Sequence, residues 1–407
     1  MPDKPSRRDF VKTTAATAAV IGMAGPAAPG VRAALPPAGL AGSSIYTRKL
    51  GITPVINGVG VVTSLGGTIM PPEVVEAMVE ASRFFIPLTE LQEKVGARVA
   101  SLLGVPAAMV SCGAASGITC ATAACVAGGD LEKVRQLPDT AGLKNEIVQQ
   151  KSHRSGYEAQ MTLVGAKIVW VETRQELDAA INERTAMMFF LNKADPDGKI
   201  QRREWIDVAR QRGVFTFNDA ASDVPPAERL RTYVREGFDL VAFSGGKGLL
   251  GPQATGFLLG RADLVRAAQH AISPHGGIGR GMKVGKEEMM GALVALERYL
   301  TVDHDAERKE LDRRADHMLR ALSGLPHVSA ELHVPEIANR VPHVTVRWNE
   351  RALGLSTQDL VGRLRGGDPP VWVSPAGEAG VEVSMWMLRG DEHELVASRL
   401  RDLLRQA

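Results

Sequence analysis

Apolar residues in the first three quarters of the chain form short uninterrupted runs separated by stretches with helical spacing. A run that begins at Ala107 ends in a turn of small residues. Short apolar runs bounded by turns are typical of strands buried on both faces, and intervening helices favour a mostly parallel sheet. The strands predicted after Ala107 lie at 146–149, 167–171, 186–191, 214–218, 240–244 and 256–259.

Helical and extended segments are also predicted before this sheet. A short helix is expected at 46–50, followed by extended segments at 55–58 and 61–63. Pro71 and Pro72 favour the first turn of the next helix, because proline fits where backbone N–H groups have no helical partner. Leu91, Val95, Val99 and Leu102 recur at helical spacing and predict a helix over 88–103.

The pattern changes in the last hundred residues. A helix at 287–303 leads out of the predicted sheet domain, and a charged helix follows at 305–322. Strands and helices then mix, which is typical of a small α+β domain. The predicted elements are extended segments at 328–332 and 343–346, a helix at 357–364, strands at 371–374 and 380–387, and a helix at 392–406.

The N-terminus has the pattern of an export signal. Arg7 and Arg8 stand before Phe10 and Lys12, an apolar run of small residues follows, and Ala33 ends a small-residue cleavage motif. Such a basic, apolar and small-residue order predicts a signal peptide, and the arginine pair resembles a bacterial twin-arginine signal. The resulting domain prediction is a signal at 1–33, a linker at 34–45, a large domain at 46–303 and a small domain at 304–407.

Composition limits the possible partners of the chain. The sequence has 407 residues, 44% of them hydrophobic, and a formal net charge of +2. Cleavage after Ala33 removes five basic and two acidic residues, which changes this charge to −1. No basic patch predicts nucleic-acid binding, and no apolar run after the signal is long enough to span a membrane, so stable membrane insertion is not expected.

Three cysteines, Cys112, Cys120 and Cys125, lie in one short segment rich in alanine. Their odd number leaves at least one thiol unpaired, and their spacing does not match a zinc site. We therefore interpret them as small residues on a packed helix over 116–127, and no metal is expected from the sequence.

Lys247 is presented by a glycine-rich turn directly after the apolar run at 240–244. Burial at the end of such a strand lowers the pKa of a lysine, and a neutral amine can attack an aldehyde. Asp219 ends the run at 214–218. A carboxylate in that position can keep the ring nitrogen of pyridoxal 5′-phosphate protonated, so that the ring accepts electrons. Together the two residues predict a pyridoxal-phosphate enzyme, although a loop lysine and a helix-capping aspartate are the ordinary interpretations of each alone.

The small-residue turn Ser111, Cys112, Gly113, Ala114 and Ala115 is a candidate phosphate site. A strand, a small-residue turn and a helix can place backbone N–H groups around an anion, although tight helix–sheet packing selects the same residues. Ligands of parallel sheets bind outside the carboxyl ends of the strands. This turn, Asp219 and Lys247 all follow predicted strands, so they are expected at one edge.

With these motifs assembled, the chain resembles the selenocysteine synthase (SelA-like) branch of fold-type-I pyridoxal-phosphate enzymes, which includes D-glucosaminate-6-phosphate ammonia lyase. The resemblance covers about 50–295 and implies an α/β fold with a mostly parallel sheet and a smaller C-terminal domain. It also implies at least a homodimer. The segments that carry it are 54–58, 65–75, 111–116, 219–221, 243–248 and 279–288.

The resemblance also implies roles for individual residues. Lys247 would carry the cofactor as a Schiff base and Asp219 would pair with its ring nitrogen. Ser244 would hold the phosphate together with the Ser111–Ala115 turn, and His153 would lie over the ring. The implied substrate contacts are Asn57, Thr63 and Arg280. For Arg280, the phosphate of the neighbouring subunit and an ordinary surface position are the alternatives to a substrate carboxylate.

The function expected from these residues is a lyase reaction on a small amino acid. Selenium transfer requires a charged transfer RNA in the cytoplasm, which does not agree with an exported chain, and a sugar phosphate is a poor periplasmic substrate. Twin-arginine export carries folded proteins, which suits an enzyme that loads its cofactor before export to the periplasm. A racemase, a transaminase and a non-catalytic exported binding protein remain alternatives.

Overall fold

The computed structural model describes residues 44–406. The predicted twin-arginine signal, the cleavage site after Ala33 and nearly all of the predicted linker lie outside these residues. The described residues belong to one compact unit. Within them, no helix combines the length and the apolar composition needed to cross a membrane.

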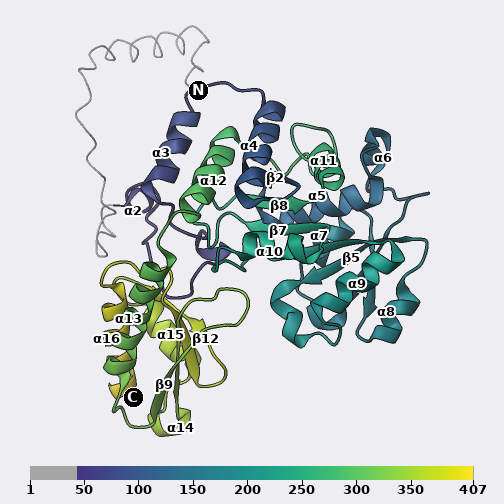
Figure 1. The fold of residues 1–407 in the computed structure, drawn as a ribbon. Helices are drawn as coiled ribbons and strands as arrows, with labels where there is room; N and C mark the ends of the chain where they lie inside the picture. Colours follow the sequence, from purple (N-terminus) through teal and green to yellow (C-terminus); the bar gives the residue numbers. More distant parts are fainter. Residues whose placement is uncertain (1–43, 407) are drawn as a thin grey trace, which may run out of the picture. The chain divides into compact units, whose positions relative to one another are not determined.

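A seven-stranded sheet organises the larger part of this unit, in the order β2-β8-β7-β6-β5-β3-β4. Strands β2, β8, β7 and β5 of this sheet are labelled in Figure 1. All neighbouring pairs are parallel except those of β8, which runs antiparallel to β2 and β7. The predicted mostly parallel sheet is therefore confirmed. The strands are β2 (Ala107–Ser111), β3 (Glu146–Gln150), β4 (Lys167–Val171), β5 (Thr185–Leu191), β6 (Phe215–Asp219), β7 (Leu240–Ser244) and β8 (Gly256–Gly260).

The antiparallel strand β8 is a feature that the apolar pattern does not predict. Only a turn that contains Lys247 connects β7 to β8, and no helix intervenes. A parallel neighbour requires a long crossover connection, so a short turn leaves only the antiparallel arrangement. The Lys247 turn consequently folds back over the edge of the sheet.

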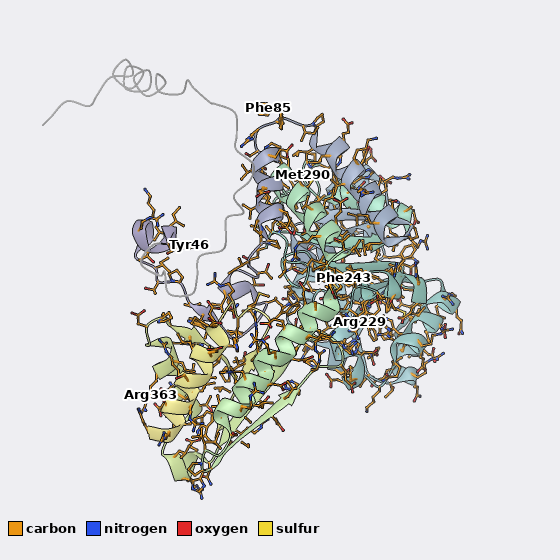
Figure 2. All side chains as sticks on the ribbon, turned by 60° about the vertical axis from the view of Figure 1, so that its left-hand side comes forward. Tyr46, Phe85, Arg229, Phe243, Met290 and Arg363 are labelled. Atoms are coloured by element: carbon orange, nitrogen blue, oxygen red, sulfur yellow. The ribbon has the colours of Figure 1, made fainter. Side chains whose placement is uncertain are left out.

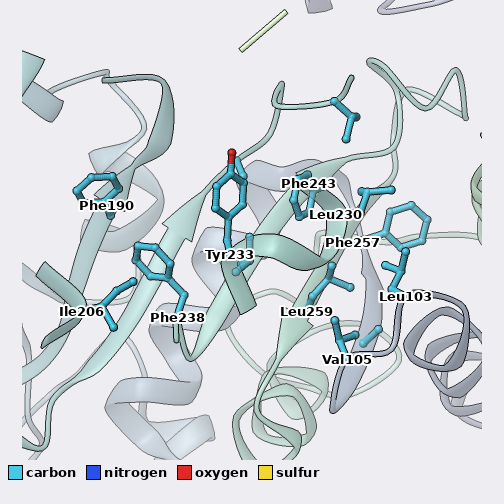
Figure 3. Close-up of a cluster of buried hydrophobic side chains, with 14 of the residues drawn as sticks. Leu103, Val105, Phe190, Ile206, Leu230, Tyr233, Phe238, Phe243, Phe257 and Leu259 are labelled. Atoms are coloured by element: carbon cyan, nitrogen blue, oxygen red, sulfur yellow. The ribbon is translucent and has the colours of Figure 1, made fainter. Parts of the chain in front are cut away.

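Helices cover both faces of the sheet, and each face has its own core. Side chains alternate along a strand, so Phe189 and Phe190 of β5 point to opposite faces and belong to different clusters. Phe243 of β7 is buried in the same cluster as Phe190, which we call the first cluster (Figures 2 and 3). The helices of this cluster include α4 (Leu88–Leu103), α9 (Arg202–Arg212), α10 (Arg229–Glu236) and α12 (Lys286–Tyr299), and those of the other include α5 (Gly113–Ala127) and α11 (Ala262–Ala271).

Helix α5 is buried on nearly every side. It packs against five strands of the sheet and against helices α11, α6 (Leu131–Gln136) and α7 (Glu158–Thr162). Cys120 and Cys125 lie buried on it and Cys112 is half-buried at its N-terminal end; all three are free thiols. The small residues of α5 allow these close approaches, as the sequence predicts for a packed helix.

The C-terminal residues build a second, antiparallel sheet in the order β12-β13-β10-β9, with a core of its own. Ile56 of β1 (Ile56–Asn57) joins this core, because β1 pairs with β11 (Val371–Trp372). An N-terminal segment thus packs with the C-terminal part. The other elements here are β9 (Val328–His333), β10 (His343–Trp348), β12 (Ser374–Pro375), β13 (Gly380–Ser384), α13 (His304–Leu322), α14 (Glu350–Leu353), α15 (Thr357–Arg365) and α16 (Glu392–Gln406).

Several predicted segments differ from the structure at their ends. The helix predicted over 287–303 ends at Tyr299, and the strand predicted over 371–374 is divided between β11 and β12, which belong to different sheets. The helix predicted from residue 116 begins at Gly113, and the strand predicted over 380–387 ends at Ser384. The extended segment predicted at 61–63 gives way to the 3-10 helix Thr63–Leu65. The remaining helices are α2 (Ile45–Leu50), α3 (Pro72–Ala81) and α8 (Arg174–Ala180), with 3-10 turns at Lys151–His153 and Asn192–Asp197.

Candidate active site

The register of the large sheet brings the predicted strand-end residues to one edge. Ser111 of β2 and Ser244 of β7 both pair with Gly256, at the start of the antiparallel strand between them. Asp219 of β6 pairs with Leu191 of β5, and Lys247 follows the end of β7 after two glycines. The carboxyl ends of these parallel strands therefore form one row, which is where α/β sheets place their ligands.

The turn that carries Lys247 is tightly folded and held by backbone hydrogen bonds. Gly245 N donates to Thr255 O over 2.8 Å, and Gly251 N donates to Gly245 O over 2.8 Å. A Cβ atom added at Gly246 would lie 2.4 Å from the Cα of Gln253, so only glycine fits there. The turn thus fixes the direction in which the lysine leaves the sheet.

Lys247 is partly buried at this edge. Burial lowers its pKa, and the positive charge of Lys193 lowers it further, whereas the carboxylates of Asp219 and Asp223 act in the opposite direction. The amine is therefore closer to its neutral, nucleophilic form than a surface lysine is.

Asp219 is a buried carboxylate with few partners. Burial raises its pKa, and opposing contributions come from the amide of Ala221 and from the lysines Lys247 and Lys193. Among the described residues, the hydrogen bond to this side chain comes from Ala221 N, over 3.1 Å to Oδ1. A buried charge needs a compensating partner, and a protonated ring nitrogen would supply one.

The N-terminus of α5 forms part of the same edge. Its N-cap residue Cys112 makes no side-chain hydrogen bond to the helix, so the first N–H groups are left for an anion. Ser111 does not point outward, because its Oγ donates to Gly113 O over 2.9 Å and the residue is fully buried. Ala114 and Ala115, predicted as part of a turn, are the second and third residues of the helix.

Strand β8 presses against this helix start. A Cβ atom at Gly256 would lie 2.6 Å from the carbonyl carbon of Gly113 and 2.7 Å from the nitrogen of Ala114. Ser244, buried at the end of β7, is the neighbour of Gly256 on its other side. The close packing leaves backbone N–H groups and small side chains at this end of the row, which suits a phosphate group.

His153 is fully buried in the structure. Its Nδ1 accepts a hydrogen bond from Leu191 N over 3.2 Å, and its ring packs edge-on against Phe190 with centroids 4.5 Å apart. Burial lowers the pKa of His153 to about 4, so its ring is neutral at pH 7. The histidine is therefore held at the end of β5, whose last residue Leu191 pairs with Asp219 of β6. Its predicted place over a cofactor ring would require one ring face to be uncovered.

The three predicted substrate contacts lie in different surroundings. The amide of Asn57 closes its own turn, because Oδ1 accepts from Val59 N and Gly60 N. Thr63 is exposed, and its carbonyl accepts from Gln253 Nε2 over 2.9 Å, which holds this turn beside the Lys247 turn. Arg280 is exposed on a separate loop. In the single chain, Thr63 thus contacts Gln253 in the segment that connects β7 to β8, whereas the side chain of Asn57 is engaged within its own turn.

A buried polar network behind Asp219 was not predicted from the sequence. Asp223 Oδ2 accepts hydrogen bonds from Asn192 Nδ2 over 2.5 Å and from the Tyr233 hydroxyl over 2.8 Å. Burial raises the pKa of Asp223 to about 6 despite these hydrogen bonds. Asn192 and Lys193 directly follow the apolar run of β5, so the strand-end rule applied to Asp219 would have found them.

Arg340 is a second residue that the sequence did not single out. The preceding residue, Asn339, donates through its backbone N to Ser222 O over 2.8 Å, which brings this C-terminal loop against the segment after Asp219. Arg340 lines a cavity of about 680 Å³ together with Pro225, Gly248 and other residues. It therefore lies on a loop that reaches the neighbourhood of the Lys247 turn from the other sheet.

Comparisons with known proteins agree with this geometry. The model of the class-V aminotransferase family matches residues 71–284. The chain is 31% identical over 377 residues to D-glucosaminate-6-phosphate ammonia lyase of Salmonella typhimurium, covering 89% of this chain and 99% of the relative. It is 33% identical over 374 residues to a 5′-C-glycyluridine monooxygenase-decarboxylase of a Streptomyces species, covering 88% and 91%. A solved structure of D-glucosaminate-6-phosphate ammonia-lyase superposes with a TM-score of 0.76 at 30% identity, over 89% and 99%.

Proposed function

Because this chain belongs to the class-V aminotransferase family and is a pyridoxal-phosphate-dependent enzyme, we propose that it is an ammonia lyase for a small amino acid. One observation carries the proposal. The structure brings Lys247 and Asp219 to one sheet edge, in a chain that matches an ammonia lyase over 99% of that relative's length.

The residues of the site fit the cofactor. The partly buried amine of Lys247 suits its aldehyde, the buried carboxylate of Asp219 suits its ring nitrogen, and the uncapped start of α5 suits its phosphate. When bound, pyridoxal phosphate withdraws electrons from the substrate Cα and so weakens the Cα–H bond. Asp219 would hold a proton at the ring nitrogen and thereby keep this withdrawal strong.

Lys247 would act as the general base. Its lowered pKa would leave the amine unprotonated, so that it could take the Cα proton of the bound substrate. The bond from Cβ to the leaving group then breaks, and the leaving group departs with the electron pair. Addition of water gives a 2-oxo acid and ammonia. A proton taken from Cα without loss of a Cβ group would instead favour racemisation or transamination.

Release of ammonia without an acceptor tests the proposal. We would incubate the mature enzyme with a panel of D- and L-amino acids, without an added 2-oxo acid, and measure ammonia and 2-oxo acid in equal amounts. Lys247→Ala is the control and should release neither. Transamination would require the acceptor, and racemisation would change only the chirality of the substrate.

The Streptomyces relative is named as a monooxygenase-decarboxylase, an enzyme that uses oxygen. The experiment must therefore also compare incubations with and without oxygen. Each incubation would therefore be repeated without oxygen while oxygen uptake and carbon dioxide are measured. Ammonia formation that is independent of oxygen supports the lyase. Oxygen-dependent release of carbon dioxide, or no reaction with any substrate in the panel, would overturn it. If Lys247→Ala lost every reaction but kept the effects of the protein in cells, the non-catalytic binding protein would be favoured.

We also propose that the enzyme is periplasmic and exported by the twin-arginine route. The support is the pair Arg7 and Arg8, the apolar run after it, and the small-residue motif that ends at Ala33. Replacing both arginines by lysine keeps the charge but changes the signal. The double variant should remain in the cytoplasmic fraction at its full length, whereas periplasmic recovery equal to that of the native chain would refute the route.

A homodimer or higher homo-oligomer is the third proposal. We define the α3 surface as Val75 and Val79 of α3 and Phe84, Phe85 and Ile86 of the following loop, all of them exposed. A groove of about 440 Å³ is lined by Val75, Val79, Phe84 and three charged residues. An exposed apolar surface of this kind supports an interface in which a second copy of the chain covers it.

A further inference from the structure

Two histidines and a glutamate gather on the C-terminal part of the molecule, outside the proposed active site. His317 lies on α13, and His393 and Glu394 are neighbours at the start of α16. One ligand atom from each residue lies within 4.8 Å of the others. The imidazole centroids are 5.2 Å apart, with the ring planes at 77°. Within residues 44–406, this is the one group of such side chains with this spacing.

The buried nitrogen of His393 points to a missing partner. The side chain of His393 is fully buried, and its Nδ1 donates to Gly390 O over 3.2 Å. Because a carbonyl only accepts, this hydrogen bond places the proton on Nδ1 and leaves the lone pair of Nε2 free. Nε2 is buried and has no hydrogen-bond partner among the described residues. Leaving such an atom unsatisfied destabilises the folded chain.

The arrangement around His393 is the one that metal-binding histidines use. A ligating imidazole commonly donates its other N–H to a backbone carbonyl, which fixes the ring and the tautomer. The nearest carboxylate oxygen, Oε1 of Glu394, lies 3.9 Å from Nε2, which is too far for a hydrogen bond. Burial lowers the pKa of His393, so the ring is in its neutral, ligating form at pH 7.

The positive charges near His393 are balanced by neighbouring carboxylates, which reduces their repulsion of a bound cation. Arg313 and Arg314 lie close enough to act on His393, but both donate to the carboxylate of Glu310 over 2.8–2.9 Å. Arg314 also donates to the carbonyl of Leu388. The positive end of α16 opposes a cation, and the carboxylate of Glu394 in the first turn offsets it. Both arginines are thus hydrogen-bonded to Glu310, which does not belong to the cluster, while Arg313 is also attracted by the carboxylates of Glu394 and Asp391.

We propose that His317, His393 and Glu394 form a binding site for a borderline divalent transition metal such as Zn²⁺, which cross-links α13 and α16. Two imidazoles and one carboxylate are a ligand set typical of this ion, with water in the remaining position. Ligand bonds of about 2.0–2.2 Å require the three atoms to move closer together. Glu394 is exposed and His317 only half-buried, so both side chains have space to turn toward Nε2. The ion would pin the last helix of the chain to the helix that it packs against.

Zinc titration of the untagged mature holoenzyme tests this site. After treatment with a chelator, the protein would be titrated with ZnCl₂ by calorimetry, and its thermal unfolding followed at each zinc concentration. We expect one zinc ion per chain and a melting temperature that rises with zinc concentration, because the ion binds only the folded state. His317→Gln and Glu394→Gln should each weaken zinc binding by at least about tenfold, which is the least that losing an outer-shell partner costs.

His327→Gln is the matched control, because His327 is an exposed histidine of the same part of the chain outside the cluster. It should bind zinc like the native protein. The variants His317→Gln and Glu394→Gln change partly or fully exposed side chains, so circular dichroism should show the native fold. Absence of zinc binding below millimolar concentration, or equal affinity in all three variants, would overturn the proposal.

Discussion

Burial gives Lys247 and Asp219 their chemistry. The same loss of water lowers the pKa of the lysine and raises that of the aspartate, so that each is closer to its neutral form than it would be in solution. Their mutual attraction acts against both shifts, because it favours the charged pair. A cofactor bound between them would take over as the partner of both groups.

Lys247→Ala should remove the spectroscopic signature of the enzyme. The purified native protein should show a violet-region band that borohydride abolishes, because reduction of a lysine Schiff base destroys the chromophore. The variant should lack this borohydride-sensitive band and lose activity by about 10²–10⁴-fold with the general base. Visible absorbance before and after borohydride measures this. A native protein that stays colourless with added pyridoxal phosphate would contradict the assignment.

His153 should make the protein sensitive to acid. Its pKa is about 4 in the folded chain and 6.5 in the reference state, so the unfolded chain binds the proton first as the pH falls. Stability from this group is present above pH 6.5 and is lost between pH 6.5 and 4, by about 3 kcal/mol. Urea unfolding would measure the free energy of unfolding at pH 7 and at pH 4.5. The loss of this free energy between the two pH values should be smaller for His153→Gln than for the native chain. An unchanged difference would show that this histidine is not buried as a neutral ring.

At the candidate site, strand β8 and helix α5 approach each other closely because a glycine lies at their contact. Strand β8 runs against the direction of its neighbours and brings Gly256 against the first residues of α5. The backbone N–H groups at that helix start depend on this contact for their position. The candidate phosphate site is therefore a property of the strand–helix pair and not of the Ser111–Ala115 segment alone.

Gly256→Ala should disturb this pair. The added Cβ would lie 2.6–2.7 Å from backbone atoms of α5, so the helix start must shift, which typically costs about 1–3 kcal/mol. We expect a lower melting temperature and weaker binding of pyridoxal phosphate in a titration followed by absorbance. Gly129→Ala is the control, since no atom lies within 4 Å of its added Cβ. Native cofactor affinity in Gly256→Ala would show that this helix start does not hold the phosphate.

Residues 44–406 combine two main sheets, each with core packing of its own, and an exposed apolar surface. β1 and the Arg340 loop connect the C-terminal sheet with segments that belong to the large one. The α3 surface lies outside all three cores, and Phe85 is fully exposed (Figure 2). The proposed dimer would bury these side chains against a second molecule.

Phe85→Glu should weaken self-association. A charge placed in an apolar interface loses its water without gaining a partner, so the dimer becomes less stable. Sedimentation velocity at micromolar concentration should show a dimer for the native chain and a larger monomer fraction for the variant. Leu332→Glu, which changes an exposed apolar residue of β9, should leave the association unchanged. A native chain that sediments as a monomer would refute the interface.

The sequence by itself determined the local elements and the reactive pair. The limits of α4 and α16 agree with the predicted helices, and Lys247 and Asp219 follow buried strands as expected. These features depend on neighbouring residues, since periodicity, turn chemistry and burial of a short run act over one or two turns of chain. The predicted export signal is equally local, and it lies outside the described residues.

Only the tertiary structure decided how distant segments meet. The reversal of β8, the pairing of β1 with β11 and the approach of Asn339 to Ser222 each join residues that no local pattern relates. The network of Asn192, Asp223 and Tyr233 and the complete burial of His153 arise in the same way. Such contacts are fixed by the packing of the whole core, where each side chain must fill the space that the others leave.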